Sequence, residues 1–177
     1  MFLSNKPKVA NFRADYAKDA DFCDIFRNDA TPLYLLAFLL TTNHKESEQC
    51  FILTVEEAFK EQTVFKEWAR SWARRRLIEN AIEIASPALR RSGEKGRHET
   101  PQECEIGTVT KLDAFERFVF VMSILERYSN WDCALLLGCG MNKVVQARMR
   151  ALRRLADLAA LFPQGDGLPM RRLGVTA

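Results

Sequence analysis

The distribution of glycine and proline constrains the fold of this chain more than any other feature of its sequence. Both residue types are almost absent between Leu33 and Ser86, and they gather in two stretches, Pro87–Gly107 and Pro163–Gly174. Because glycine and proline interrupt helices and strands, the long stretch without them predicts regular structure. The first gathering is polar and has no helical or strand period, so it predicts a linker. The second gathering predicts a frayed tail.

Apolar residues recur at steps of three and four on both sides of this linker, and strand-like alternation is absent from the sequence. That period is typical of amphipathic helices. We therefore predict an all-α protein made of two small helical domains. The expected first unit is 19–85, the linker 86–110, the second unit 111–161 and the tail 162–177.

The first unit carries three helix signals. Thr31 followed by Pro32 predicts a helix start, with the helix running to about Thr42, and Asn43 followed by Glu46 predicts a second N-cap. The expected buried stripe of the next helix is Cys50, Phe51, Thr54, Val55, Ala58 and Phe59. The expected core positions of a third helix are Phe65, Trp68, Trp72 and Leu77. We expect both tryptophans to be core residues rather than a platform for stacking bases.

The second unit is predicted to begin with a helix that has one long buried face, followed by a short helix and a final longer one. The face consists of Leu112, Phe115, Phe118, Met122 and Leu125. Ser129 and Asp132 predict a capping box that opens a short helix, and Gly138 and Gly140 predict its end. A final helix from about Met141 is expected to bury Val144, Ala151, Leu155 and Leu158.

Composition bounds the class of protein. Hydrophobic residues make up 47% and charged residues 28%, and the net charge is +3, which is ordinary for a core-forming protein. The N-terminus predicts no signal peptide, and the apolar run Leu33–Leu40 is too short to cross a bilayer. Five cysteines without a close pair predict free thiols in the cytoplasm, with Cys133 and Cys139 as buried hydrophobes.

A short helix, a glycine-containing turn and a longer basic helix form the order of a helix-turn-helix. The expected base-reading residues at the start of the last helix are Asn142, Lys143 and Gln146, because such side chains pair with base edges in the major groove. Arg150, Arg153 and Arg154 are expected to contact phosphates. A helical hairpin with a solvated charged face is the alternative that stays open.

The stretch Leu112–Leu155 resembles region 4 of the sigma-70 family, in its extracytoplasmic-function subgroup. The resemblance rests on the lead-in ERFVFVMSILERYS, the short helix DCALLLGCG, Val144 and the run Arg150–Leu152. The first unit resembles region 2. There, LYLLAFLLTTNHKESEQCFILTVEEAFK has the spacing of the family's helix pair, and FKEWARSWARRRLIENAI has the pattern of its promoter-melting helix.

The resemblance implies a bacterial transcription initiation factor without enzymatic activity and without a cofactor. Region 2 would dock on core RNA polymerase and open the −10 element, and region 4 would read the −35 element. An anti-sigma protein would be a further partner of such a factor. Four arginines would then lie near the −10 DNA: Arg70, Arg74, Arg75 and Arg76.

Several positions depart from the family's pattern. The surface that meets the polymerase carries Gln49, Ile52 and Leu53, two of them apolar where the family is polar. A customary asparagine and aspartate of the melting helix are Arg75 and Glu79, and the usual Lys-Ser-Arg-Leu run is Val145, Gln146, Ala147 and Arg148. These departures motivate an alternative: a divergent sigma-like protein that acts as a DNA-binding regulator or an interaction module without initiating transcription.

Other motifs indicate little chemistry. His98 and Cys104 lack the spacing of a zinc site, so we expect no metal. Glu56 and Glu57 are expected on a solvated helix face rather than as an acid/base pair. No phosphate loop or nucleophile motif is present in the sequence.

Overall fold

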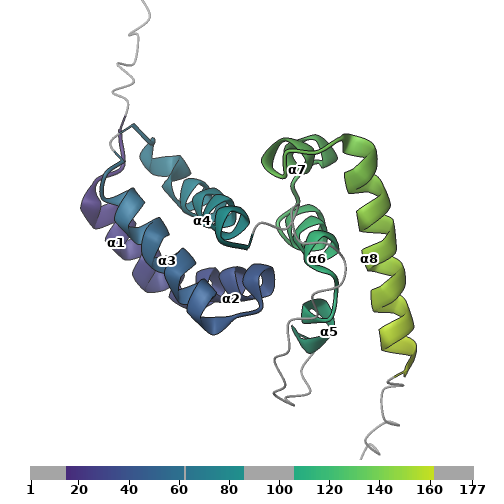
Figure 1. Ribbon diagram of the computed structural model, residues 1–177. Coiled ribbons are helices and arrows are strands. Elements are labelled where there is room, and N and C mark those ends of the chain that lie inside the picture. The colour runs from purple at the N-terminus through teal and green to yellow at the C-terminus, as the bar shows by residue number, and fades with distance from the viewer. Residues whose placement is uncertain (1–14, 62, 86–105, 162–177) are drawn as a thin grey trace, which may run out of the picture.

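The computed structural model describes residues 15–61, 63–85 and 106–161, and these residues form two groups of helices (Figure 1). The first group contains α1 (Asp19–Asn28), α2 (Ala30–Thr41), α3 (His44–Ala58), the 3₁₀ turn η1 (Lys66–Trp68) and α4 (Ala69–Ala85). The second contains α5 (Ile106–Thr110), α6 (Ala114–Phe120), the π-helical turn η2 (Val121–Leu125), α7 (Asn130–Leu136) and α8 (Met141–Leu161). Within the described residues the only extended pairing is an isolated bridge between Tyr16 and Phe65. The all-α prediction is confirmed.

Local sequence explains where α2 ends and α3 begins. Thr42 takes a left-handed conformation with φ of 58° and ends α2, and the Asn43 side chain accepts hydrogen bonds from the backbone N–H groups of Lys45 (2.9 Å) and Glu46 (3.3 Å). The predicted N-cap at Asn43 is therefore confirmed. The predicted start of α2 was wrong, because the helix begins at Ala30. Pro32 is tolerated one turn inside, where the backbone N–H groups have no helical partner.

The third predicted helix starts later than its apolar period indicates. Phe65 precedes the 3₁₀ turn η1, where its ring stacks on Tyr16 at 5.0 Å. Trp68 ends that turn with 58% of its surface exposed, so its prediction as a core residue was wrong. Trp72 is half-buried and packs edge-on against Phe22. A change from 3₁₀ to α geometry shifts the direction of the side chains, which is why Trp68 points away from the core.

Two further core predictions were wrong at helix ends. Phe59 lies one residue beyond α3 and is exposed, and Leu125 lies at the end of η2 and is exposed. The remaining stripe residues of α3, from Cys50 to Ala58, are buried or half-buried. Helix α5 occupies the last five residues of the predicted linker. The rest of that linker and the predicted tail fall outside the described residues.

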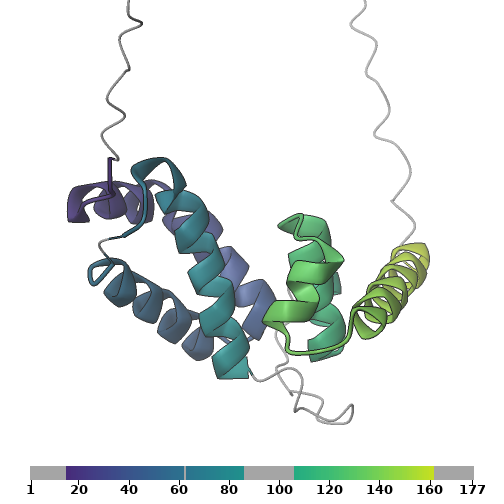
Figure 2. The ribbon, with the colours of Figure 1, turned by 90° about the horizontal axis from the view of Figure 1, so that it is seen from above.

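The buried residues of both groups form one continuous apolar cluster. The first group contributes Phe22, Leu40 and Ile78, and the second contributes Phe118 and Met122. Helix α2 packs against α5, α6 and η2, so the two groups lie side by side, with α8 on the side away from the first group (Figures 1 and 2).

A buried arginine ties the two groups together. Arg117 of α6 is 5% exposed, and its Nε and Nη2 both donate to the Leu40 carbonyl oxygen at the end of α2, each at 3.2 Å. Its Nη1 donates to the Leu112 carbonyl oxygen at 3.0 Å. Buried polar groups are stable only when hydrogen-bonded, and the two bonds to Leu40 join the two groups.

Candidate nucleic-acid interface

The α7–turn–α8 segment has the local geometry that its sequence predicts. The Ser129 hydroxyl accepts a hydrogen bond from the Asp132 N–H at 3.1 Å, and the Asp132 carboxylate accepts one from the Ser129 N–H at 3.3 Å. This reciprocal capping box opens α7 and confirms the prediction. Gly138 follows α7 with φ of +59°, a conformation that favours glycine. The chain then turns and α8 begins at Met141.

Helix α8 packs on α6 and α7 through a narrow face of small residues. Val144, Ala147 and Ala151 are fully buried there, and Leu155 is half-buried beside them. Arg148, four residues before the exposed Leu152, is half-buried. The rest of the helix surface between Met141 and Asp157 is open to solvent, and it carries all the residues predicted to contact DNA in this unit.

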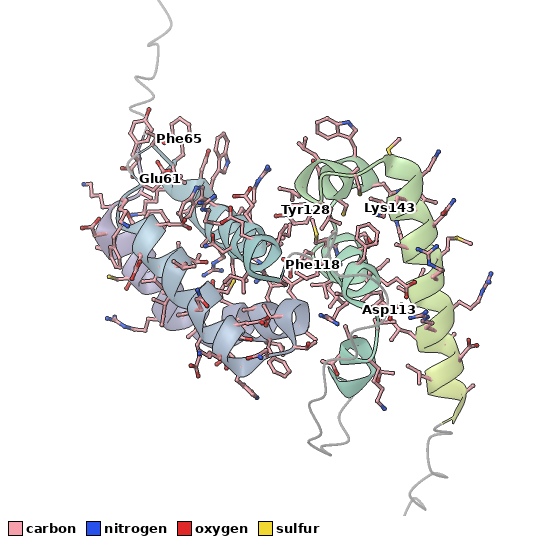
Figure 3. All side chains as sticks on the ribbon, viewed as in Figure 1. Glu61, Phe65, Asp113, Phe118, Tyr128 and Lys143 are labelled. Carbon is pink, nitrogen blue, oxygen red and sulfur yellow. The ribbon has the colours of Figure 1, made fainter. Side chains whose placement is uncertain are left out.

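The side chains of the three predicted base-reading residues do not all point the same way. Asn142 and Gln146 are exposed on α8. The Lys143 ammonium lies 4.5 Å from the centre of the Phe115 ring, a cation–π contact that directs it toward α6 (Figure 3). Asn142 and Gln146 are therefore available to a partner, while Lys143 would have to leave the ring first.

The three predicted phosphate-contacting arginines of α8 also differ. Arg150 Nε lies 2.8 Å from the buried Glu116 carboxylate of α6. Arg154 bridges Asp113 (2.8 Å) and Glu116 (3.1 Å), and its hydrogen bond to Asp113 raises the pKa of the guanidinium above its usual value. Figure 3 shows Asp113 on the side of α6 that faces α8. Arg153 is exposed and forms no ion pair with any described residue.

All four arginines predicted near the −10 DNA are held by carboxylates. Three pairs join α4 to other parts of the fold: Arg70 to Asp29 (2.8 Å), Arg74 to Glu126 (2.9 Å) and Arg76 to Glu57 (2.7 Å). Arg75 and Arg76 also pair with Glu79 within α4, at 3.0 Å each. The Arg76 hydrogen bonds, together with one from Asn80, lower the pKa of the Glu57 carboxyl. The arginine cluster is thus largely neutralised within the chain.

A pocket of about 520 Å³ at the joint between the two groups was not predicted. Its walls include Phe65, Trp68, Trp72 and Arg75 from the first group and Tyr128 from the second. Figure 3 shows Tyr128 on the side of the second group that faces α4, and burial raises the pKa of its hydroxyl. The aromatic residues stood out in the sequence, but Tyr128 joins them only through the packing of the two groups.

The predicted partner-binding residues lie together on α3. Gln49 and Ile52 are exposed, Ile52 with 54% of its surface, and Leu53 is half-buried. Ile52 therefore does not pack internally and is open to a partner.

The described residues contain no cluster of side chains that would hold a metal ion, and none of their helices is long and apolar enough to cross a membrane. His98 and Cys104 lie outside the described residues. The chain matches no protein-family model and no curated protein.

Proposed function

We propose that this chain is a sigma-like transcription protein that binds promoter duplex DNA through α7 and α8 and associates with core RNA polymerase. The observation that carries the proposal is the polar strip of Asn142, Gln146 and Arg153 on α8, exposed directly after a capped helix and a tight glycine turn. In a helix-turn-helix the first helix braces the second, whose early residues enter the major groove.

The side chains of this strip have two roles: recognition of bases and contact with phosphates. The side-chain amides of Asn142 and Gln146 can donate to and accept from adenine at the same time, which distinguishes one base pair from another. Arg153 lies two to three turns further along and is suited to a phosphate, which holds the helix in place without reading sequence. Helix α8 lies on the side of the second group away from the first, so duplex DNA would reach it without displacing α4 (Figure 2).

The joint between the two groups supports a role for the first group in binding single-stranded DNA. Trp68 is exposed and lines the aromatic pocket together with Tyr128. Aromatic side chains of this kind stack on unpaired bases at about 1–3 kcal/mol per base. The arginines of α4 would help only after phosphates replace their carboxylate partners.

A second candidate function, an interaction module that does not initiate transcription, is favoured by the α3 surface. An exposed Ile52 beside Leu53 is an apolar surface where the sigma family is polar. Such a surface suits a protein partner other than the polymerase.

The experiment that separates the two candidates is a pull-down of the full chain with bacterial core RNA polymerase, with an unaltered sigma factor as competitor. Competitive binding supports initiation. Binding that the variant Ile52→Gln/Leu53→Glu leaves unchanged would place the polymerase contact elsewhere. No binding, with duplex DNA binding retained, leaves a DNA-binding regulator as the function.

A further inference from the structure

Helix α8 carries an apolar stripe that nothing in the described structure covers. Met141, Val145 and Met149 follow one another at four-residue steps, and Leu152 comes three residues later. Such spacing places the four side chains on one face of the helix. Each is between 41% and 59% exposed. At 1.5 Å per residue the stripe runs for about 16 Å, the length of about three helical turns.

The stripe is separate from both other faces of α8. The core face consists of Val144, Ala147 and Ala151, none of which belongs to the stripe. On the opposite border, Asn142 lies three residues before Val145, and Gln146 lies three residues before Met149. The stripe therefore borders the polar strip proposed to contact DNA, and it follows the same outward side of the helix.

The charges beside the stripe are positive and uncompensated. Arg148 lies three residues from Val145 and four from Leu152, and Arg153 lies four residues from Met149. Neither arginine forms an ion pair with any residue that the structure describes. The other two arginines of this helix, Arg150 and Arg154, are already paired with α6. The stripe is thus an apolar seam between two free guanidinium groups.

We propose that this stripe docks an amphipathic helix of a partner protein whose apolar seam is flanked by acidic residues. Helices recognise grooves and faces through apolar anchors at such three- and four-residue steps. Acidic flanks would pair with Arg148 and Arg153. A second copy of this chain is disfavoured, because two such stripes would bring their arginines together. The two methionines provide a flexible apolar surface, which is typical of sites that bind helical partners.

The proposal also implies regulation, a part that rests on the proposed DNA-binding function. A helix seated on the stripe would lie beside Asn142, Gln146 and Arg153. It would obstruct insertion of α8 into the major groove, so the partner helix and duplex DNA would exclude each other.

The test uses the full chain and a fluorescein-labelled synthetic helix of about 14 residues, with leucines at three- and four-residue steps and glutamates on both flanks. We expect anisotropy to show saturable binding, and Val145→Glu and Met149→Glu to weaken it by at least about tenfold, since each places a like charge against the probe. Leu35→Glu is the matched control, because it adds the same charge at an exposed apolar site on α2, away from the stripe, and it should leave the affinity unchanged. A probe with lysines in place of the glutamates should bind at least about tenfold more weakly.

Three outcomes would overturn the docking proposal: no binding of the acidic probe, equal binding by the stripe variants, or equal binding of the lysine probe. Concentration-dependent dimerisation in sedimentation that Met149→Glu abolishes would assign the stripe to a second copy instead. Probe binding by a chain that does not bind duplex DNA would overturn only the proposed function. DNA binding without probe binding would overturn only this inference.

Discussion

Arg74 on α4 and Glu126, directly after η2, form an ion pair that links the two groups of helices, with Arg74 Nε donating to Glu126 Oε2 at 2.9 Å. The Glu126 side chain is only 11% exposed, and the second nitrogen of the same guanidinium donates to its other oxygen. The same arginine is one of those expected near the −10 DNA. Because Arg74 is paired with Glu126, its positive charge becomes available to nucleic acid only when this ion pair between the two groups breaks.

Replacing Glu126 with glutamine should loosen the joint. Partial exposure of Arg74 screens the pair, so we expect the free energy of unfolding in urea to fall by about 1 kcal/mol. The released guanidinium should strengthen binding of a single-stranded oligonucleotide and steepen its salt dependence. The matched control is Glu48→Gln, which removes one exposed carboxylate of α3 that has no partner among the described residues. Equal effects of the two changes would mean that net charge alone, rather than the Arg74 pair, is responsible.

The turn before α8 should depend on one glycine and not on its neighbour. Gly138 has φ of +59° and Gly140 has no such constraint, while a Cβ at either position meets nothing within 4 Å. We expect Gly138→Ala to lower the free energy of unfolding by about 1 kcal/mol through backbone strain alone. Gly140→Ala, measured in the same urea titration, should stay close to the unchanged chain. An equal loss for both would contradict the left-handed turn.

Adjacent arginines of α8 should behave differently toward DNA. Arg153 is exposed and has no carboxylate partner among the residues that the structure describes, so Arg153→Ala should weaken binding to every duplex and reduce the salt slope by about one. Arg154 is held by Asp113 and Glu116, so Arg154→Ala should change the slope little and lower stability instead. Anisotropy titrations at several salt concentrations, paired with urea unfolding, measure both effects. The reverse assignment would show that the Arg154 pairs break on binding.

The Cys50 thiol should make the protein less stable at alkaline pH. The thiol is fully buried and donates to the Leu77 carbonyl oxygen, and burial raises its pKa from 9.0 to about 12. A raised folded-state pKa stabilises the fold below the unfolded value, and the contribution is lost as pH rises toward the folded value. Relative to Cys50→Ala, the unchanged chain should therefore lose about 1 kcal/mol per pH unit above about pH 9. A difference that stays constant with pH would contradict this burial.

The sequence predicted local features well because their causes are local. The cap at Asn43 and the capping box of Ser129 and Asp132 need only residues within one turn, and both are present. The core prediction failed at Trp68, where a 3₁₀ turn interrupts the helical period. A prediction from the spacing of apolar residues assumes one continuous helix, so it does not locate a 3₁₀ turn within that spacing.

The ion pairs of the arginines could not be predicted from the sequence, for a different reason. Arg74 meets Glu126 and Arg150 meets Glu116 across long stretches of chain, and only tertiary packing brings these residues together. The roles of Asn142 and Gln146 remain predictions, because their exposure permits DNA contact without establishing it. The same holds for the likeness to sigma regions 2 and 4.

Selection from a pool of random duplexes tests our claim that α8 reads duplex DNA. The full chain should enrich a defined sequence, and Asn142→Ala/Gln146→Ala should change or abolish that preference while retaining weak, salt-sensitive binding. Enrichment of the same sequence by both proteins would contradict the roles assigned to these two side chains. No enrichment by the unchanged chain would contradict the claim itself and leave α8 as a protein-docking helix.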